Sequence, residues 1–96
     1  MNHIRVALYD MKSGTAEEAG ELARAGMLPI FKGMPGYVRY EVGKLDNGGI
    51  VSFSIWETEG EAHDADRAAA SWVKENLADR ISLREDHVGD LLWDEA

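Results

Sequence analysis

The sequence predicts an α+β domain in which an antiparallel sheet packs against two helices. Apolar and polar residues alternate in several short segments, and this pattern is typical of strands with one buried face. Two other segments open with Thr-x-x-Glu and continue with apolar residues at helical spacing, which indicates two capped helices. An Asn-Gly pair between two alternating segments indicates a hairpin.

The first half of the chain reads as a strand followed by a helix. A strand is predicted at residues 3–9, where alternate positions are aliphatic: Ile4, Val6 and Leu8. Thr15 and Glu18 fit a capping box at the start of the helix. Its apolar stripe consists of Ala19, Leu22, Ala23, Gly26 and Ile30. Because the residue before a proline disfavours helical geometry, we expect the helix to kink or end at Pro29.

The second half reads as a hairpin, a helix and a last strand. Strands are predicted at residues 36–45 and 50–57, joined by the turn Asp46-Asn47-Gly48-Gly49. Thr58 and Glu61 open the second helix, whose stripe is Ala62, Ala65, Ala69, Trp72, Val73 and Leu77. The last strand is predicted at residues 81–93, and its alternation slips near Asp86, where we expect a bulge.

This order of elements predicts one domain spanning residues 1–96 with the ferredoxin-like βαββαβ fold. Right-handed crossovers then give a four-stranded antiparallel sheet with two helices on one face. In the first and third predicted strands, one set of alternate positions is apolar, and we expect this set to lie under the helices: Ile4, Val6, Leu8, Val51, Phe53 and Ile55. The opposite face is mixed aromatic and polar. It is either solvated or covered by a second copy of the chain, which would bury Tyr37, Trp56 and Trp93; we favour the second copy.

Composition and charge exclude several classes of function. The 96 residues carry 18 acidic and 10 basic side chains, a net charge of -8, which repels nucleic-acid phosphates and anionic lipid surfaces. The absence of cysteine excludes disulfides, thiolate metal sites and a cysteine nucleophile. The first residues lack the apolar core of a signal peptide, and we expect a cytoplasmic protein.

Several short motifs resemble the antibiotic biosynthesis monooxygenase domain of the dimeric α+β barrel superfamily. They are Met34-Pro35-Gly36-Tyr37, Ser54-Ile55-Trp56-Glu57, the helix start at Thr58, and His87-Val88-Gly89-Asp90. The resemblance implies a homodimer whose two sheets face each other as a barrel. It also implies a pocket between sheet and helices, where catalytic members oxygenate phenolic, quinol or anthrone substrates without metal or flavin. We therefore expect no cofactor and a small aromatic substrate or ligand.

Such a reaction needs groups that hold a ring and move a proton. Tyr40 and His63 are the candidate catalytic residues, and Trp56, Trp72 and Phe53 are the candidate substrate-binding residues. Each also has a purely structural interpretation. Trp72 lies on the apolar stripe of its helix, Trp56 fits a core or interface anchor, and His63 fits an exposed partner of Glu59 or Arg67.

Two alternatives to a cofactor-free oxygenase follow from the same residues. Haem-degrading relatives carry an Asn on the first strand and a ligand His on the second helix. Here Ala7 replaces the Asn and His63 lies too near the helix start, so we do not expect haem degradation, and we assign no metal site. A non-catalytic homodimer that binds a small apolar ligand, or that serves simply as a stable accessory module, is the second alternative. A filled space between sheet and helices would favour the latter, and an open pocket would favour the enzyme.

Overall fold

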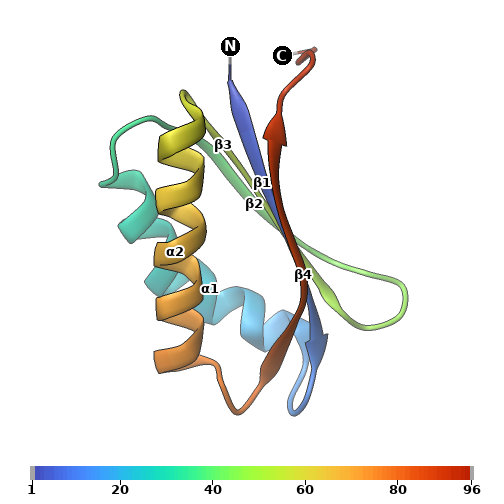
Figure 1. Ribbon diagram of the computed structural model, residues 1–96. Coiled ribbons are helices and arrows are strands. Elements are labelled where there is room, and N and C mark those ends of the chain that lie inside the picture. The colour runs from blue at the N-terminus through green and yellow to red at the C-terminus, as the bar shows by residue number, and fades with distance from the viewer. Residues whose placement is uncertain (1, 96) are drawn as a thin grey trace.

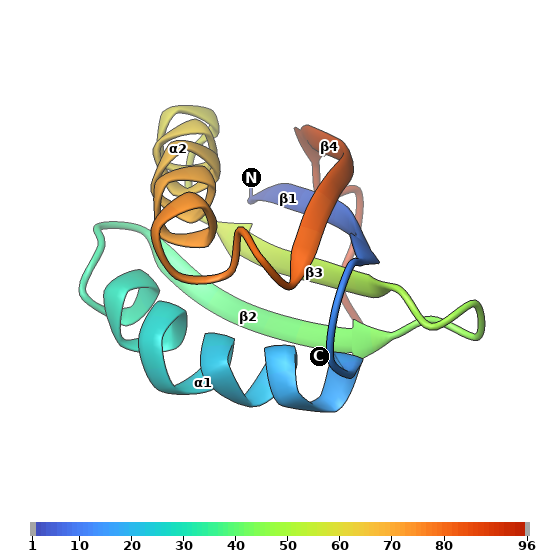
Figure 2. The same cartoon turned by 90° about the horizontal axis from the view of Figure 1, so that it is seen from below.

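The elements of the chain occur in the predicted order, strand, helix, strand, strand, helix, strand. The computed structural model describes residues 2–95, and within them the elements are β1 (His3–Met11), α1 (Ala16–Lys32), β2 (Tyr37–Lys44), β3 (Ile50–Trp56), α2 (Glu59–Asn76) and β4 (Ile81–Asp90). The strands of this described part form one antiparallel sheet in the order β2-β3-β1-β4. Both helices cover the same face of it (Figure 1, Figure 2). The ferredoxin-like fold is therefore confirmed.

The helices begin where the sequence predicts. The Thr15 side chain accepts a hydrogen bond from the Glu18 backbone N–H, and the Glu18 carboxylate accepts one from the Thr15 backbone N–H. Thr58 likewise accepts from the Glu61 N–H at the start of α2. Of the two effects expected of Pro29, the end of the helix does not occur, since α1 continues to Lys32. The fully buried Phe31 holds this last turn in the core despite the proline.

The hairpin and the bulge also follow the prediction. The Leu45 N–H donates to the Gly49 carbonyl at 2.8 Å, and Gly48 has a φ of 90°, which glycine adopts without strain. Between β1 and β4 the register shifts because Leu8 lies opposite Glu85 whereas Tyr9 lies opposite Leu83. Arg84 is therefore the extra residue of a bulge, close to the position where the alternation slips. Strand β4 ends at Asp90, earlier than predicted.

The assignment of the two sheet faces from the sequence is wrong for β1 and β3. The helices cover the parity that contains Arg5, Ala7, Tyr9, Ile50, Ser52, Ser54 and Trp56, all of them buried. The aliphatic set lies on the other face, where cross-strand neighbours are Ile4 with Ile55, Val6 with Phe53, and Leu8 with Val51. Tyr37 and Trp56, expected at a subunit interface, pack into the core of their own chain.

Side-chain volume explains this inversion. The helix positions buried against the sheet are mostly alanines: Ala16, Ala19, Ala23, Ala62, Ala65 and Ala69. Small side chains on the helices leave space that a close-packed interior fills with large side chains from the strands. Tyr9, Trp56 and the long Arg5 supply that volume, whereas aliphatic residues of medium size would leave voids.

Candidate functional site

A buried guanidinium lies between the sheet and the helices. Arg5, on β1, is 1% exposed. Its Nε donates to Asp66 Oδ1 at 3.1 Å, its Nη1 to Ser52 Oγ at 3.1 Å, and its Nη2 to the Tyr9 hydroxyl at 3.4 Å. Burial of a charge is costly unless it is paired and hydrogen bonded, and these partners meet that need. We call Arg5, Tyr9, Tyr40, Ser52 and Asp66 the Arg5 cluster.

Two tyrosines of the Arg5 cluster remain protonated well into the alkaline range. Burial raises the pKa of Tyr9 and of Tyr40 above the usual value of 10.0, and the nearby charge of Arg5 only partly offsets it. The Tyr40 hydroxyl is also hydrogen bonded to Ser52. At neutral pH both phenols are therefore protonated and able to donate a hydrogen bond, and neither acts as a base.

A carboxyl pair lies beside the guanidinium. Desolvation raises the pKa of Asp66, a hydrogen bond with Asp86 raises it further, and the charge of Arg5 opposes both effects. The two carboxyls come from different elements, Asp66 from α2 and Asp86 from β4. Neighbouring carboxyl groups tend to share a proton because both cannot ionise freely at short distance. This pair is thus suited to hold or release a proton next to a fixed cation.

Four residues of the Arg5 cluster line a small cavity between the sheet and the helices. The cavity has a volume of about 30 Å³, and Arg5, Tyr9, Tyr40, Ser52 and Trp72 contribute to its wall together with aliphatic residues of both helices. This volume has room for about one or two water molecules. An aromatic ring does not fit there without space from the grooves on either side.

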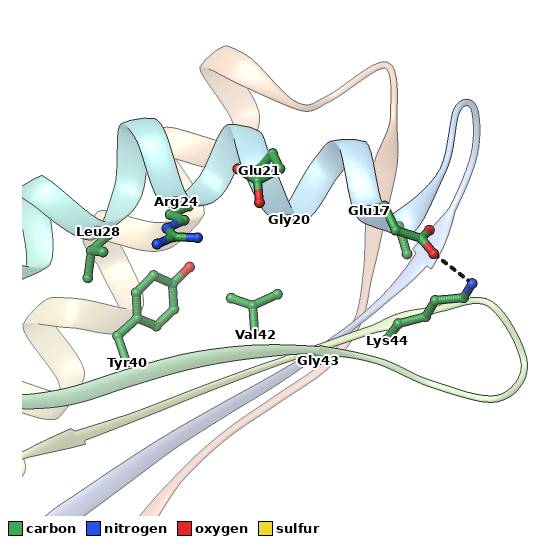
Figure 3. Close-up of a pocket in the computed structure, with 10 residues that line it drawn as sticks. Glu17, Gly20, Glu21, Arg24, Leu28, Tyr40, Val42, Gly43 and Lys44 are labelled. Atoms are coloured by element: carbon green, nitrogen blue, oxygen red, sulfur yellow. Dashed lines mark hydrogen bonds and ion pairs between the residues drawn. The ribbon is translucent and has the colours of Figure 1, made fainter.

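The larger of these grooves lies between α1 and β2, with a volume of about 470 Å³. Figure 3 shows Tyr40 and Val42 on its strand side, with the Tyr40 hydroxyl directed toward α1. Gly20 on the helix and Gly43 on the strand leave its centre free of side chains. An ion pair between Lys44 Nζ and Glu17 Oε2, 3.0 Å apart, bridges one end. Tyr40 and Val42 also line the inner cavity, so this groove abuts the Arg5 cluster.

The other groove lies between α2 and β4 and has a volume of about 230 Å³. Five polar residues line it, including Arg5, Tyr9, Asp66 and Asp86. Its remaining wall is mostly aliphatic: Ala70, Val73, Ala78, Ile81 and Leu83, with Lys74 beside them. Arg5 therefore faces this groove directly, in contrast to the groove of Figure 3.

The structure brings Tyr40 and Trp72 to the cavity between the layers, and both pack against the core cluster that contains Trp56, whereas Phe53 and His63 lie elsewhere. Trp56 is 0% exposed, packs edge-on against Phe31 at 5.1 Å and donates from Nε1 to Ser54 at 2.9 Å, which makes it a core anchor. Phe53 lies on the sheet face away from the helices. His63 is half exposed on α2, 3.8 Å from Glu59, and lines none of the three cavities just described in residues 2–95.

The sequence analysis missed Arg5, Tyr9, Ser52 and Asp66. Arg5, Tyr9 and Ser52 were missed because their strand positions were predicted to lie on the outer face of the sheet, whereas they are buried beneath the helices. The alanine-rich helix stripes were the signal that large strand residues would be needed beneath them. Asp66 carries no such signal, since its position follows from the approach of α2 to β1.

Two negative observations concern the part of the chain that the structure covers. Among residues 2–95, no three or more His, Asp or Glu side chains are grouped so that they could hold a metal ion. Neither helix within that range is both long enough and apolar enough to cross a membrane.

Comparison with known proteins identifies relatives of this fold. The sequence profile described as Antibiotic biosynthesis monooxygenase matches residues 2–75. No curated protein sequence matches the chain. Similar solved structures include MupZ from Pseudomonas fluorescens, with a TM-score of 0.71, 11% identity, and coverage of 91% of this chain and 66% of MupZ.

Two further structures match over nearly their whole length. HapK from Hahella chejuensis has a TM-score of 0.70 and 12% identity, with 100% of this chain and 97% of HapK covered. SnoaB, described as a cofactor-independent oxygenase from Streptomyces nogalater, has a TM-score of 0.65 and 18% identity, with 98% and 96% covered. At these identities the likeness shows the fold.

Proposed function

The chain belongs to the antibiotic biosynthesis monooxygenase family, and from this premise we propose that it is a cofactor-independent monooxygenase of a small phenolic or quinol molecule. The observation that carries the proposal is the buried Arg5 guanidinium, which donates hydrogen bonds to the Ser52 and Tyr9 hydroxyls and lies beside a carboxyl pair. SnoaB, which shares the fold, is described as a cofactor-independent oxygenase, and this agrees with the proposal.

In such a reaction the substrate supplies the electrons. A phenolic hydroxyl loses its proton, and the electron-rich phenolate passes an electron to dioxygen. The two radicals then combine at the ring carbon para to the hydroxyl, and loss of water leaves a quinone. One oxygen atom of O₂ enters the carbonyl, the other leaves as water, and all four electrons come from the substrate. The protein must exclude water, stabilise negative charge and move a proton.

The Arg5 cluster can meet these needs. The Arg5 guanidinium stabilises the phenolate and the reduced oxygen species, since a fixed charge in a dry site costs no reorganisation during the reaction. Tyr9 and Tyr40 remain protonated and donate hydrogen bonds to developing oxyanions. Trp72 lines the inner cavity beside this cluster, and its ring lies against Gly26 of α1. His63 has no part in this proposal because of its position on the outside of α2.

We also propose that the partner is a second copy of the chain, bound across the open face of the sheet. That face carries a central apolar patch, Ile4, Val6, Leu8, Val51 and Phe53, on the side opposite the helices, beside Ile55, which is 2% exposed. Residues of both charge signs flank it, with Arg39 and Glu41 on β2 and Glu85 and His87 on β4. An apolar centre with a polar rim is the usual anatomy of a homodimer interface. Leu92 and Trp93, 84% and 78% exposed, would be covered by the same partner.

The test of the activity is oxygen consumption with a panel of phenols, hydroquinones, naphthols and anthrones. We expect uptake of O₂ in equal amount to the quinone formed, with one atom of labelled dioxygen in the product. Tyr40→Phe removes one donor and should lower the rate without unfolding the protein, because the ring that packs against Phe31 at 4.7 Å is kept. Lack of turnover of every compound by a verified dimer would refute catalysis.

A non-catalytic module that binds a small ligand is the second candidate. The observation that favours it is the inner cavity of about 30 Å³, which leaves most of the space between sheet and helices filled by side chains. This alternative predicts binding of apolar aromatic compounds without O₂ uptake. Binding and oxygen consumption measured on the same compounds therefore separate the two candidates.

A further inference from the structure

The groove between α2 and β4 combines a cation, a proton acceptor and an apolar wall. It has a volume of about 230 Å³, and a cavity of about 150 Å³ suffices for a benzene ring. A single ring therefore fits in the groove. The aliphatic wall, Ala70, Val73, Ile81 and Leu83, suits the ring, and the polar end suits one hydroxyl group.

The polar end of this groove differs from that of the groove in Figure 3. Arg5 and Asp66, joined at 3.1 Å, both line the α2–β4 groove. The α1–β2 groove instead carries the exposed charges of Glu17, Glu21, Arg24 and Lys44 and does not include Arg5 in its wall. A phenol that needs both a base and a buried cation finds them together in the α2–β4 groove.

We propose that the α2–β4 groove binds a one-ring phenol, that Asp66 accepts the proton of its hydroxyl, and that Arg5 pairs with the resulting phenolate. This inference rests on the proposed function and names its substrate class and its base. In the transfer, the phenolic O–H bond breaks, its electron pair stays on the phenolic oxygen, and the proton forms an O–H bond on the Asp66 carboxylate. The net charge of the groove is unchanged, because the negative charge moves from the Asp66 carboxylate to the phenolic oxygen while the proton moves the other way.

The surroundings of Asp66 favour this exchange. Desolvation raises the pKa of Asp66, and the neighbouring Asp86 on β4 raises it further, so an added proton is well held. Arg5 approaches from β1, and it keeps a negative partner throughout, first the carboxylate and then the phenolate. Tyr9 on β1 and Lys74 on α2 also line the groove. The tyrosines cannot replace Asp66 as base, since burial raises the pKa of both.

The position of the site is tested with para-nitrophenol, whose electron-poor ring binds without passing electrons to O₂. In the amide NMR spectrum we expect its addition to shift Ala70 and Leu83 in the α2–β4 groove, and to leave Gly20 and Gly43 of the α1–β2 groove unchanged. Ala70→Trp fills the first groove and should weaken binding about tenfold or more. Gly20→Leu, at a position where an added Cβ meets nothing within 4 Å, fills the other and should have no effect. Absence of binding, or the reverse pattern of shifts, overturns the proposal.

The role of Asp66 is tested by the fate of the proton, at a pH below the solution pKa of para-nitrophenol. The nitrophenolate absorption should appear on binding without release of a proton to the buffer, as measured by calorimetry in buffers of different ionisation enthalpy. In Asp66→Asn we expect about one proton released for each phenolate formed, whereas Glu21→Gln should behave as wild type. Release of a proton by the wild-type protein overturns Asp66 as acceptor. If para-nitrophenol binds in the α2–β4 groove but no phenol causes O₂ uptake, the proposed oxygenase activity is refuted and this inference about binding stands. If phenols cause O₂ uptake but the ligand binds in the α1–β2 groove, this inference is refuted and the oxygenase activity stands.

Discussion

The contact between the two helices at Gly26 gives the sharpest prediction of stability. A Cβ added to Gly26 would lie 2.4 Å from Cζ2 of Trp72 and 2.9 Å from its Cε2, far inside van der Waals distance. In an open position within a helix, Gly→Ala stabilises by about 1 kcal/mol. Overpacking of a filled interior costs about 1–3 kcal/mol. Gly26→Ala should therefore lower the free energy of unfolding by up to about 2 kcal/mol, although alanine is the better helix former.

The matched control is in the same helix. An added Cβ at Gly20 meets nothing within 4 Å, so Gly20→Ala should raise the free energy of unfolding by about 0.5–1 kcal/mol. Urea unfolding of the two variants and wild type measures both changes, and for a domain of this size about 1 kcal/mol corresponds to about 4–8 °C in melting temperature. Equal stability of Gly26→Ala and Gly20→Ala would refute the close packing of Trp72 on α1, and with it the wall of the inner cavity.

Three further predictions concern ionisation, assembly and His63. In the folded protein the raised pKa values keep Tyr9 and Tyr40 protonated at a pH where the tyrosines of the unfolded chain, with a pKa of 10.0, ionise. The free energy of unfolding should therefore be constant with respect to these two groups below that pH and should fall as the pH rises above it. Urea unfolding between about pH 9 and 11 should show a smaller fall for Tyr40→Phe than for wild type. Trp93→Ala should weaken the proposed dimer, and sedimentation equilibrium that shows unaltered association would contradict the role of this exposed tryptophan. His63→Ala should leave both melting temperature and turnover unchanged, since its ring is half exposed and 3.8 Å from Glu59; a slower enzyme would return His63 to the site.

Local patterns predicted the elements of the fold well. Capping at Thr15 and Thr58, the turn at Gly48 and the bulge near Asp86 each depend on residues close in sequence, so the signals can be interpreted without knowledge of the tertiary structure. The end expected at Pro29 did not occur because Phe31, two residues later, is held by core contacts that lie outside the local pattern.

The side of the sheet that the helices cover could not be read from polarity alone. Both parities of β1 and β3 are largely apolar or neutral, and the choice depends on the volume that the helices leave. With alanines facing the sheet, the parity with Tyr9 and Trp56 fills the interior better than the aliphatic one. This single inversion explains why Phe53 left the candidate site and why Arg5 entered it.

The candidate site depends on contacts between distant segments. Arg5 and Asp66 are separated by 61 positions, and Arg5 and Ser52 by 47. No spacing in a single sequence reports such proximity. Tyr40 was found because its strand position was clear, whereas the partners that determine its protonation became visible only in the folded chain.

The most direct test of the central claim is oxygen consumption by Arg5→Gln beside Arg39→Gln. Arg39 is an exposed arginine at the rim of the open sheet face, so its substitution controls for the loss of a positive charge. With a one-ring phenol that the wild-type protein oxygenates, we expect turnover by folded Arg5→Gln to fall about 100-fold or more and turnover by Arg39→Gln to remain. Equal oxygen uptake by folded Arg5→Gln and wild type would contradict a reaction centred on the buried guanidinium.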